Sequence, residues 1–190
     1  MARAYLRNAP EGDQRPEPLS TPVVDRALES RLPDVKAWLK PRIPSLEDSD
    51  IKFALSSALK GSGADAFRAG VILKDMFSWP VDIDLIMVLR DAIEGLAIAL
   101  KIETGHWVLR TGLRFPGKDG DTIEWEDENG KARAGTIKTI DRTYAQALVQ
   151  PPDGLTKVYK PVRVIAESVT ANITQAEYPK IIPLAANGAA

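Results

Sequence analysis

Four carboxylates are crowded into one short segment of this sequence, and such a cluster could bind a metal ion or transfer a proton. They stand within five positions: Glu124, Glu126, Asp127 and Glu128. A calcium loop of the EF-hand type needs oxygen ligands at alternate positions, followed by a glycine and a more distant glutamate. Counted from Asp119, Asp121 fits that spacing but Ile123 does not. We therefore expect no metal site and no cofactor at this cluster.

The same segment has the pattern of a β-hairpin. Ile123 and Trp125 alternate with acidic residues, so the apolar pair would face a core while the acids face water. Asn129-Gly130 favours a type I′ turn, because both central residues of that turn need a positive φ. Lys131 and Arg133 would then lie across from the acids on the returning strand. This interpretation accounts for the charges without a ligand, and we prefer it.

Other residues that could do chemistry are isolated. His106 is the only histidine, and neither a nucleophile nor an orienting acid can be assigned to it. The chain has no cysteine, which excludes disulfides, thiolate zinc sites and cysteine nucleophiles. We therefore expect no catalytic residue and no enzyme activity.

Two further polar segments are better explained as helix ends. The segment KGSGAD, residues 60–65, lacks the Lys-Ser/Thr ending of a phosphate loop and follows no strand. We expect a turn between helices there, with Asp65 or Ser62 near the next N-cap. Asp82 and Asp84 could bind a cation together, but helix capping accounts for at least one of them.

The nearly balanced charge of the chain argues against a nucleic-acid binder. Lys and Arg number 25 and Asp and Glu 26, for a formal net charge of −1, whereas proteins that neutralise phosphates usually carry a basic excess. A local basic patch could still lie within the balanced total. The candidate residues for nucleic-acid contact are Lys157, Lys160 and Arg163. Nucleic-acid binding through this region is the alternative function.

No segment favours secretion or membrane insertion. Residues 1–18 are polar and contain prolines, without the apolar core of a signal peptide. The longest apolar stretch, 83–102, carries Arg90, Asp91 and Glu94 near its middle, and a membrane span would bear these charges at high cost. We expect a cytoplasmic protein, or one within a particle assembled in the cytoplasm, with no membrane partner.

The elements that position these residues begin with a run of helices over residues 21–103. We expect helices from an N-cap at Thr21-Pro22, from Pro33, behind a capping box at Ser45 and Asp48 that ends at Gly61, and over 64–77. The strongest pattern is 82–101, whose apolar residues cover well over half of the helix circumference. Such a helix is either surrounded by other elements or lies in a subunit interface.

At Gly105 the apolar period changes from 3.6 to 2, which predicts strands from there on. The candidate strands are HWVLRTGLRFP, TIEWED, RAGTIKTID, TYAQALVQ and KVYKPVRVIAESV, and turn signals separate several of them. Pro161 indicates that its strand lies at an edge or a bulge. Closely spaced short strands over 104–170 predict a small closed or half-closed β-barrel.

This region resembles the core of SH3-like small barrels of the KOW or Tudor kind over residues 105–168. The matching residues are Gly120, Asp121, Ile123, Trp125, Gly130, Gly135 and Ile137. The resemblance implies a fold and a tendency to bind partners, and it implies no particular activity. Tudor domains use an aromatic cage, and none can be assembled here because Trp125 is better explained as an inward-facing residue.

The predicted fold is α+β, in four parts. An extended arm (1–20) precedes a helical domain (21–103), a small β-barrel (104–170) and an extended C-terminal arm (171–190). The arms look suited to reach neighbours, and the candidate assembly contacts are Tyr178, Ile181, Ile182 and Leu184. We expect a non-enzymatic structural or adaptor protein that assembles with copies of itself and with further subunits into a larger particle, of which a phage virion is an example.

Overall fold

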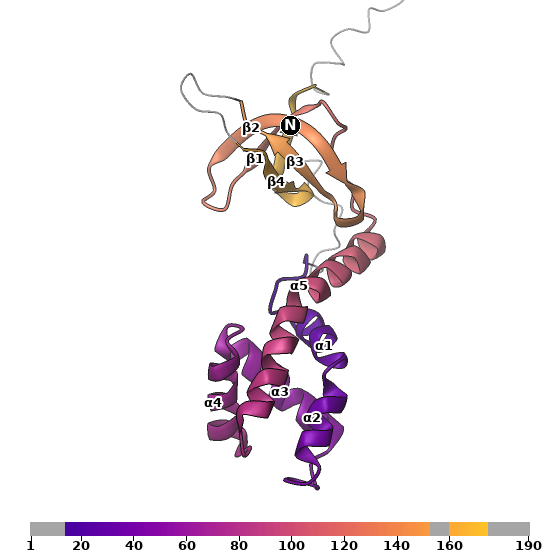
Figure 1. Ribbon diagram of the computed structural model, residues 1–190. Coiled ribbons are helices and arrows are strands. Elements are labelled where there is room, and N and C mark those ends of the chain that lie inside the picture. The colour runs from indigo at the N-terminus through magenta and orange to yellow at the C-terminus, as the bar shows by residue number, and fades with distance from the viewer. Residues whose placement is uncertain (1–13, 153–159, 175–190) are drawn as a thin grey trace, which may run out of the picture. The chain divides into compact units, whose positions relative to one another are not determined.

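The computed structural model describes residues 14–152 and 160–174. These residues form two compact units: a helical unit, Arg15–Trp107, and a sheet unit that contains Gln14 and the described residues from Val108 onward (Figure 1). The chain is thus α+β, which confirms the predicted fold class. The boundary between the units lies four residues beyond the predicted one at 103/104. Of the two predicted arms, residues 1–13 and 175–190 lie outside the described residues.

The helical unit contains the helices α1 (Thr21–Glu29), α2 (Leu32–Leu39), α3 (Asp48–Ser62), α4 (Ala66–Phe77) and most of α5 (Ile83–Thr111). Each of the five places apolar side chains into one shared core. The largest fully buried members are Leu39, Leu55, Leu59, Leu73, Leu85, Leu89, Val23, Val24 and Val35. The described end of the N-terminal arm joins this unit, since Leu19 packs against the core and the Arg15 guanidinium lies 5.1 Å from the centre of the Trp107 ring.

The ends of α3 differ from the prediction. The N-cap residue is Glu47, which makes no capping hydrogen bond through its side chain, so the predicted capping box at Ser45 is wrong. The helix also continues through Gly61 and stops at Gly63, whose φ of +65° suits a glycine. Gly61 has a packing role instead. A Cβ there would lie 3.1 Å from the Cδ1 atom of Ile72, so its absence lets α4 approach α3 closely.

Helix α5 is ten residues longer at its C-terminal end than the pattern predicted. It runs through Gly105 to Thr111 and is followed by Gly112 at φ +66°, so the predicted strand over HWVLRTGLRFP is wrong. Aromatic and β-branched residues favour strands, but that preference is weak against tertiary packing. Trp107 and Val108 are both buried as helix residues. Burial of these two side chains explains why this segment is helical and not a strand.

The described strands form one antiparallel sheet, in the order β4-β3-β2-β1-β5. They are β1 (Thr122–Glu126), β2 (Ala132–Asp141), β3 (Gln146–Gln150), β4 (Val162–Ile165) and β5 (Val169–Asn172). Short 3₁₀ helices, Arg142–Tyr144 and Ala166–Ser168, join β2 to β3 and β4 to β5. Among the described residues this sheet is open, and a closed barrel stays a prediction. Strand β4 is an edge strand, as Pro161 predicted.

The sheet unit has a small apolar core with one buried carboxylate. The buried apolar side chains include Ile123, Trp125, Ile137, Val149, Val164 and Val169. Asp121, which is 1% exposed, accepts hydrogen bonds from the backbone N–H of Lys118 (3.1 Å) and the side-chain amide of Asn172 (2.9 Å). These bonds tie the entry of β1 to the end of β5.

Candidate interaction surfaces

The acidic segment is the turn of a hairpin, and Asp127 holds that turn together. Its Oδ1 atom accepts hydrogen bonds from the backbone N–H groups of Asn129 and Lys131, both at 3.0 Å. Its Oδ2 atom accepts from Nε of Arg133 at 2.9 Å. Ile123 and Trp125 are buried whereas Glu124 and Glu126 are exposed, which confirms the predicted alternation. The hydrogen bond from Lys131 and that from Arg133 lower the pKa of Asp127.

The predicted turn type is wrong. Gly130 has φ +70°, but Asn129 is not among the residues with positive φ, so this is not a type I′ turn. The N–H of Gly130 donates to the carbonyl of Asp127 (2.8 Å), and the N–H of Asp127 donates to the carbonyl of Lys131 (3.0 Å). This is a type I turn followed by a left-handed glycine. The carboxylate of Asp127 favours it, because its hydrogen bonds fix the loop backbone locally.

We expect divalent cations to leave the stability of the protein unchanged. Within residues 14–152 and 160–174, no three acidic or histidine side chains are grouped so as to hold a metal ion. A ligand that binds only the folded state must stabilise it. Calcium, magnesium or zinc at saturating concentration should therefore leave the melting temperature unchanged in differential scanning calorimetry. A rise of several degrees, reversed by a chelator, would contradict the hairpin interpretation.

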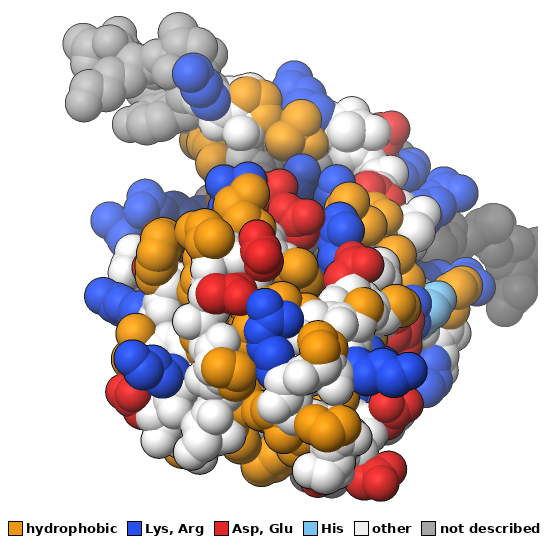
Figure 2. All heavy atoms as spheres, turned by 60° about the horizontal axis from the view of Figure 1, so that its bottom comes forward, with side chains coloured by type: hydrophobic (Ala, Val, Ile, Leu, Met, Phe, Trp, Pro, Cys, Tyr) orange, Lys and Arg blue, Asp and Glu red, His pale blue; other side chains and the backbone are white. Residues whose placement is uncertain are grey.

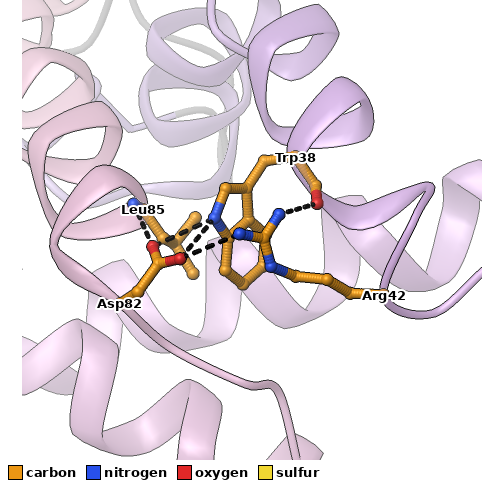
Figure 3. A network of polar contacts seen from close by, with 4 residues as sticks. All are labelled: Trp38, Arg42, Asp82 and Leu85. Atoms are coloured by element: carbon orange, nitrogen blue, oxygen red, sulfur yellow. Dashed lines mark hydrogen bonds and ion pairs between the residues drawn. The ribbon is translucent and has the colours of Figure 1, made fainter.

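Asp82 is the centre of a polar network that fixes the start of α5 (Figure 3). Its Oδ1 atom accepts from the backbone N–H of Leu85 at 3.1 Å, so Asp82 caps α5 as predicted. The indole Nε1 of Trp38 donates to both carboxylate oxygens, at 3.0 and 3.1 Å. Arg42 reaches Oδ2 at 3.0 Å, and its guanidinium lies 4.4 Å from the centre of the Trp38 ring. The carboxylate joins two segments of the helical unit.

This network predicts a pH-dependent stability. The N–H of Leu85, helped by Trp38 and Arg42, lowers the pKa of Asp82. A carboxyl whose folded pKa is depressed stabilises the fold above its unfolded pKa, near 4, and loses that contribution as pH falls through the folded pKa. Asp82→Asn keeps a capping oxygen but loses the charge. We expect the variant to be less stable than wild type in urea unfolding at pH 7, and the gap to close below about pH 4.

The control for this experiment is Asp75→Asn at an exposed position of α4, which should leave the urea midpoint near that of wild type. Because 37% of the Asp82 side chain is exposed, we expect a modest effect. A gap between wild type and Asp82→Asn that stays constant from pH 7 to pH 3 would show that the charge of Asp82 does not stabilise the fold.

Contacts within the helical unit also explain the positions of His106 and of the segment 60–65. His106 lies on α5, where its Nδ1 atom is 3.9 Å from Oε1 of Glu103, and the same oxygen pairs with Arg26. Its predicted place at the start of a strand is therefore wrong. Asp65 caps α4, because its Oδ1 atom accepts from the N–H of Arg68 at 2.9 Å, as the helix-turn interpretation predicted. Neither residue requires a ligand to explain its position.

The residues proposed for nucleic-acid contact are only partly described. Lys160 and Arg163 are exposed, and Lys157 lies outside the described residues. Arg163 lines a groove of about 1150 Å³ in the sheet unit, together with Arg133 and the acidic hairpin residues Glu126, Asp127 and Glu128. Arg163 thus shares this groove with carboxylates. The charge of this groove is mixed, whereas a surface that follows phosphates is usually basic.

The predicted assembly contacts Tyr178, Ile181, Ile182 and Leu184 lie outside the described residues. The helical unit has a different surface with exposed hydrophobic side chains. Figure 2 shows hydrophobic side chains spread over the face of the protein that it presents, interleaved with charged ones. The exposed large hydrophobic residues of this unit are Phe53, Phe67, Val71, Met76, Ile83, Met87, Ile98 and Ile102.

Half of these residues follow one face of α5. Ile83 and Ile98 are 63% and 64% exposed, and Met87 and Ile102 are also exposed. Between them lie Arg90 and Glu94, which form an ion pair at 3.7 Å. The predicted breadth of the apolar face signalled this surface, but the pattern alone could not show which part of the circumference the core covers. Here the core takes Leu85, Leu89, Ala92, Leu96 and Ala99.

No protein-family model, curated protein or solved structure matches this chain. Among the described residues, no helix combines the length and the hydropathy needed to cross a lipid bilayer.

Proposed function

We propose that this protein is a non-enzymatic structural or adaptor protein that assembles with copies of itself and with other subunits into a larger particle. A phage virion is one example of such a particle. The observation that supports this proposal is the set of exposed large hydrophobic side chains on the helical unit. Exposed apolar patches on a folded unit mark interaction sites when they are contiguous and rimmed by polar residues.

The distribution of these side chains favours assembly over a single small ligand. They lie on the outer faces of three helices, α3, α4 and α5, each of which already contributes an apolar face to the core. Phe67 is 70% exposed on α4, and Phe53 on α3 contacts the ring of Phe77 edge-on, with centroids 6.2 Å apart. Convex helix faces with exposed aromatic rings suit a second protein surface, whereas small ligands bind in concave sites.

For the sheet unit we propose an SH3-like barrel of the KOW or Tudor kind that contacts partners. Its support is the position of the residues that carry the resemblance. Ile123 and Trp125 lie in β1, Gly130 lies in the turn, and Gly135 and Ile137 lie in β2. The mixed charge around Arg163 favours protein partners over nucleic acid.

The experiment that tests the proposed function is the mass of the full-length chain in solution. We expect light scattering to show a species heavier than one chain of 20.7 kDa. The mass should not depend on added cofactor or metal, since the proposal requires neither. A single-chain mass at every concentration, with unchanged mass in the presence of partner subunits of the native particle, would contradict the proposal.

A further inference from the structure

The exposed hydrophobic residues of α5 are spaced almost symmetrically about the middle of the segment from Ile83 to Ile102. Ile83 and Ile102 stand at equal distances along the chain from a point between Ala92 and Ile93, and so do Met87 and Ile98. Arg90 and Glu94 flank the same point to within one residue. Figure 1 shows α5 crossing the helical unit with α4 on one side and α1 and α2 on the other. The side chains of its outer face, Ile83, Met87, Ile98 and Ile102, are exposed.

We propose that this face pairs with the same face of α5 in a second copy, with the two helices antiparallel around a two-fold axis near Ala92 and Ile93. This inference rests on the proposed assembly function and names its first contact. In such a pair, Ile83 of each copy lies against Ile102 of the partner, and Met87 against Ile98. The apolar side chains that the isolated chain leaves exposed then cover one another.

Charge complementarity identifies a second copy as the occupant. In the antiparallel arrangement Arg90 of one chain lies within one residue of the level of Glu94 of the other, and the two-fold axis creates this pair twice. Glu94 is level with Asp91 of the other chain, whose carboxylate already lies 3.8 Å from Arg31 of its own chain. In a parallel pair Arg90 would face Arg90 and Glu94 would face Glu94, which is repulsive. An isologous contact of this kind is the commonest way in which identical chains associate. The Arg90 and Glu94 charges are thus complementary between two copies only when the helices are antiparallel.

Gly95 gives an independent reason for a close neighbour at this face. A glycine inside a helix destabilises it by about 1 kcal/mol relative to alanine. Nothing lies within 4 Å of the place that a Cβ of Gly95 would occupy, so packing within the chain does not require this glycine. It follows Asp91 by one turn and precedes Ile98 by three residues, on the flank of the exposed face. A partner helix that approaches there explains its small size.

The length of the contact limits the area that it can bury. From Ile83 to Ile102 the face extends about 29 Å at 1.5 Å per residue. A pair of helices of this length stands at the low end of the roughly 1,200–2,000 Å² that specific interfaces bury. We therefore expect reversible association with a Kd on the order of micromolar.

Sedimentation velocity on full-length variants tests this pairing. Ile98→Asp should abolish the association, because it buries an unpaired charge in the contact. Lys52→Asp, at an exposed polar site on α3 outside the exposed hydrophobic set, is the control and should keep the wild-type mass. Circular dichroism and the melting temperature of each variant establish that its fold is intact. An Ile98→Asp variant that is folded and keeps the wild-type mass would overturn the pairing and leave the assembly function standing.

Substitutions of Arg90 and Glu94 test whether the two α5 helices are antiparallel. Arg90→Glu or Glu94→Arg alone should raise the Kd about tenfold, since each replaces two attractive pairs by two repulsive ones. The double variant Arg90→Glu with Glu94→Arg exchanges the charges and should return the Kd close to that of wild type. A double variant no better than the single ones, or a single variant that associates more tightly, would overturn the antiparallel arrangement. A wild-type chain that associates neither with itself nor with partner subunits of the native particle would instead remove the proposed function itself.

Discussion

Replacement of Gly135 by valine is expected to unfold the sheet unit or to destabilise it by about 3 kcal/mol or more. A Cβ at this position would lie 2.5 Å from the carbonyl oxygen of Gln150 and 2.8 Å from Cγ1 of Val149. The first of these atoms belongs to the backbone of β3, so it cannot move aside without disturbing the sheet. Far-UV circular dichroism and urea unfolding measure the loss.

The matched control is Ala134→Val, one residue earlier in β2. It adds the same branched side chain at a half-buried position that already carries a Cβ, and valine is favourable in strands. We expect a change within about 0.5 kcal/mol. If Gly135→Val unfolds at the same urea concentration as Ala134→Val, the close approach of β2 and β3 at Gly135 is not a feature of the protein.

Replacement of Leu55 by alanine is expected to destabilise the helical unit by about 2–5 kcal/mol. Leu55 lies on α3 and is fully buried in the core that the five helices share. Truncation removes three buried carbon atoms and leaves a cavity that close-packed neighbours fill only in part. Loss of the helical signal at 222 nm during thermal unfolding measures the effect.

Leu109→Ala makes the same chemical change at a side chain that is 81% exposed. It should leave the melting temperature within the range of ordinary surface substitutions. Equal effects of the two leucine variants would show that the core of the helical unit is not where the structure places it.

Local patterns predicted the helices well where burial and capping agree with them. The apolar spacing of Ile51, Ala54, Leu55, Ala58 and Leu59 predicted the buried face of α3, and all five are buried. Asp65 and Asp82 were each one of two predicted cap candidates, beside Ser62 and Asp84, and both accept backbone hydrogen bonds at helix starts. These signals are short-range, so the sequence near each residue contains most of the information.

The prediction failed where tertiary contacts outweigh local preference. The segment after Gly105 has the composition of a strand, but Trp107 and Val108 are buried in helical form. Asn129-Gly130 favours a type I′ turn, yet the hydrogen bonds of Asp127 select a type I turn with a left-handed glycine. Both failures depend on contacts that the sequence pattern does not contain.

The candidate surface was predictable only in part. The breadth of the apolar face of α5 indicated an interface or a central position. The core covers one side of the helix, and the apolar side chains on another side are exposed. The core covers Leu89, whereas Ile98 stays exposed. The division between them depends on where α1, α3 and α4 pack, which no local pattern determines.

The mass of the full-length chain across a dilution series shows whether the chain associates with itself. Sedimentation equilibrium from about 1 to about 300 µM covers the range in which a micromolar contact forms and dissociates. We expect a mass that rises from one chain of 20.7 kDa toward two or more, and a return to the single-chain mass in Ile98→Asp. A mass that stays at one chain over the whole range would contradict this expectation.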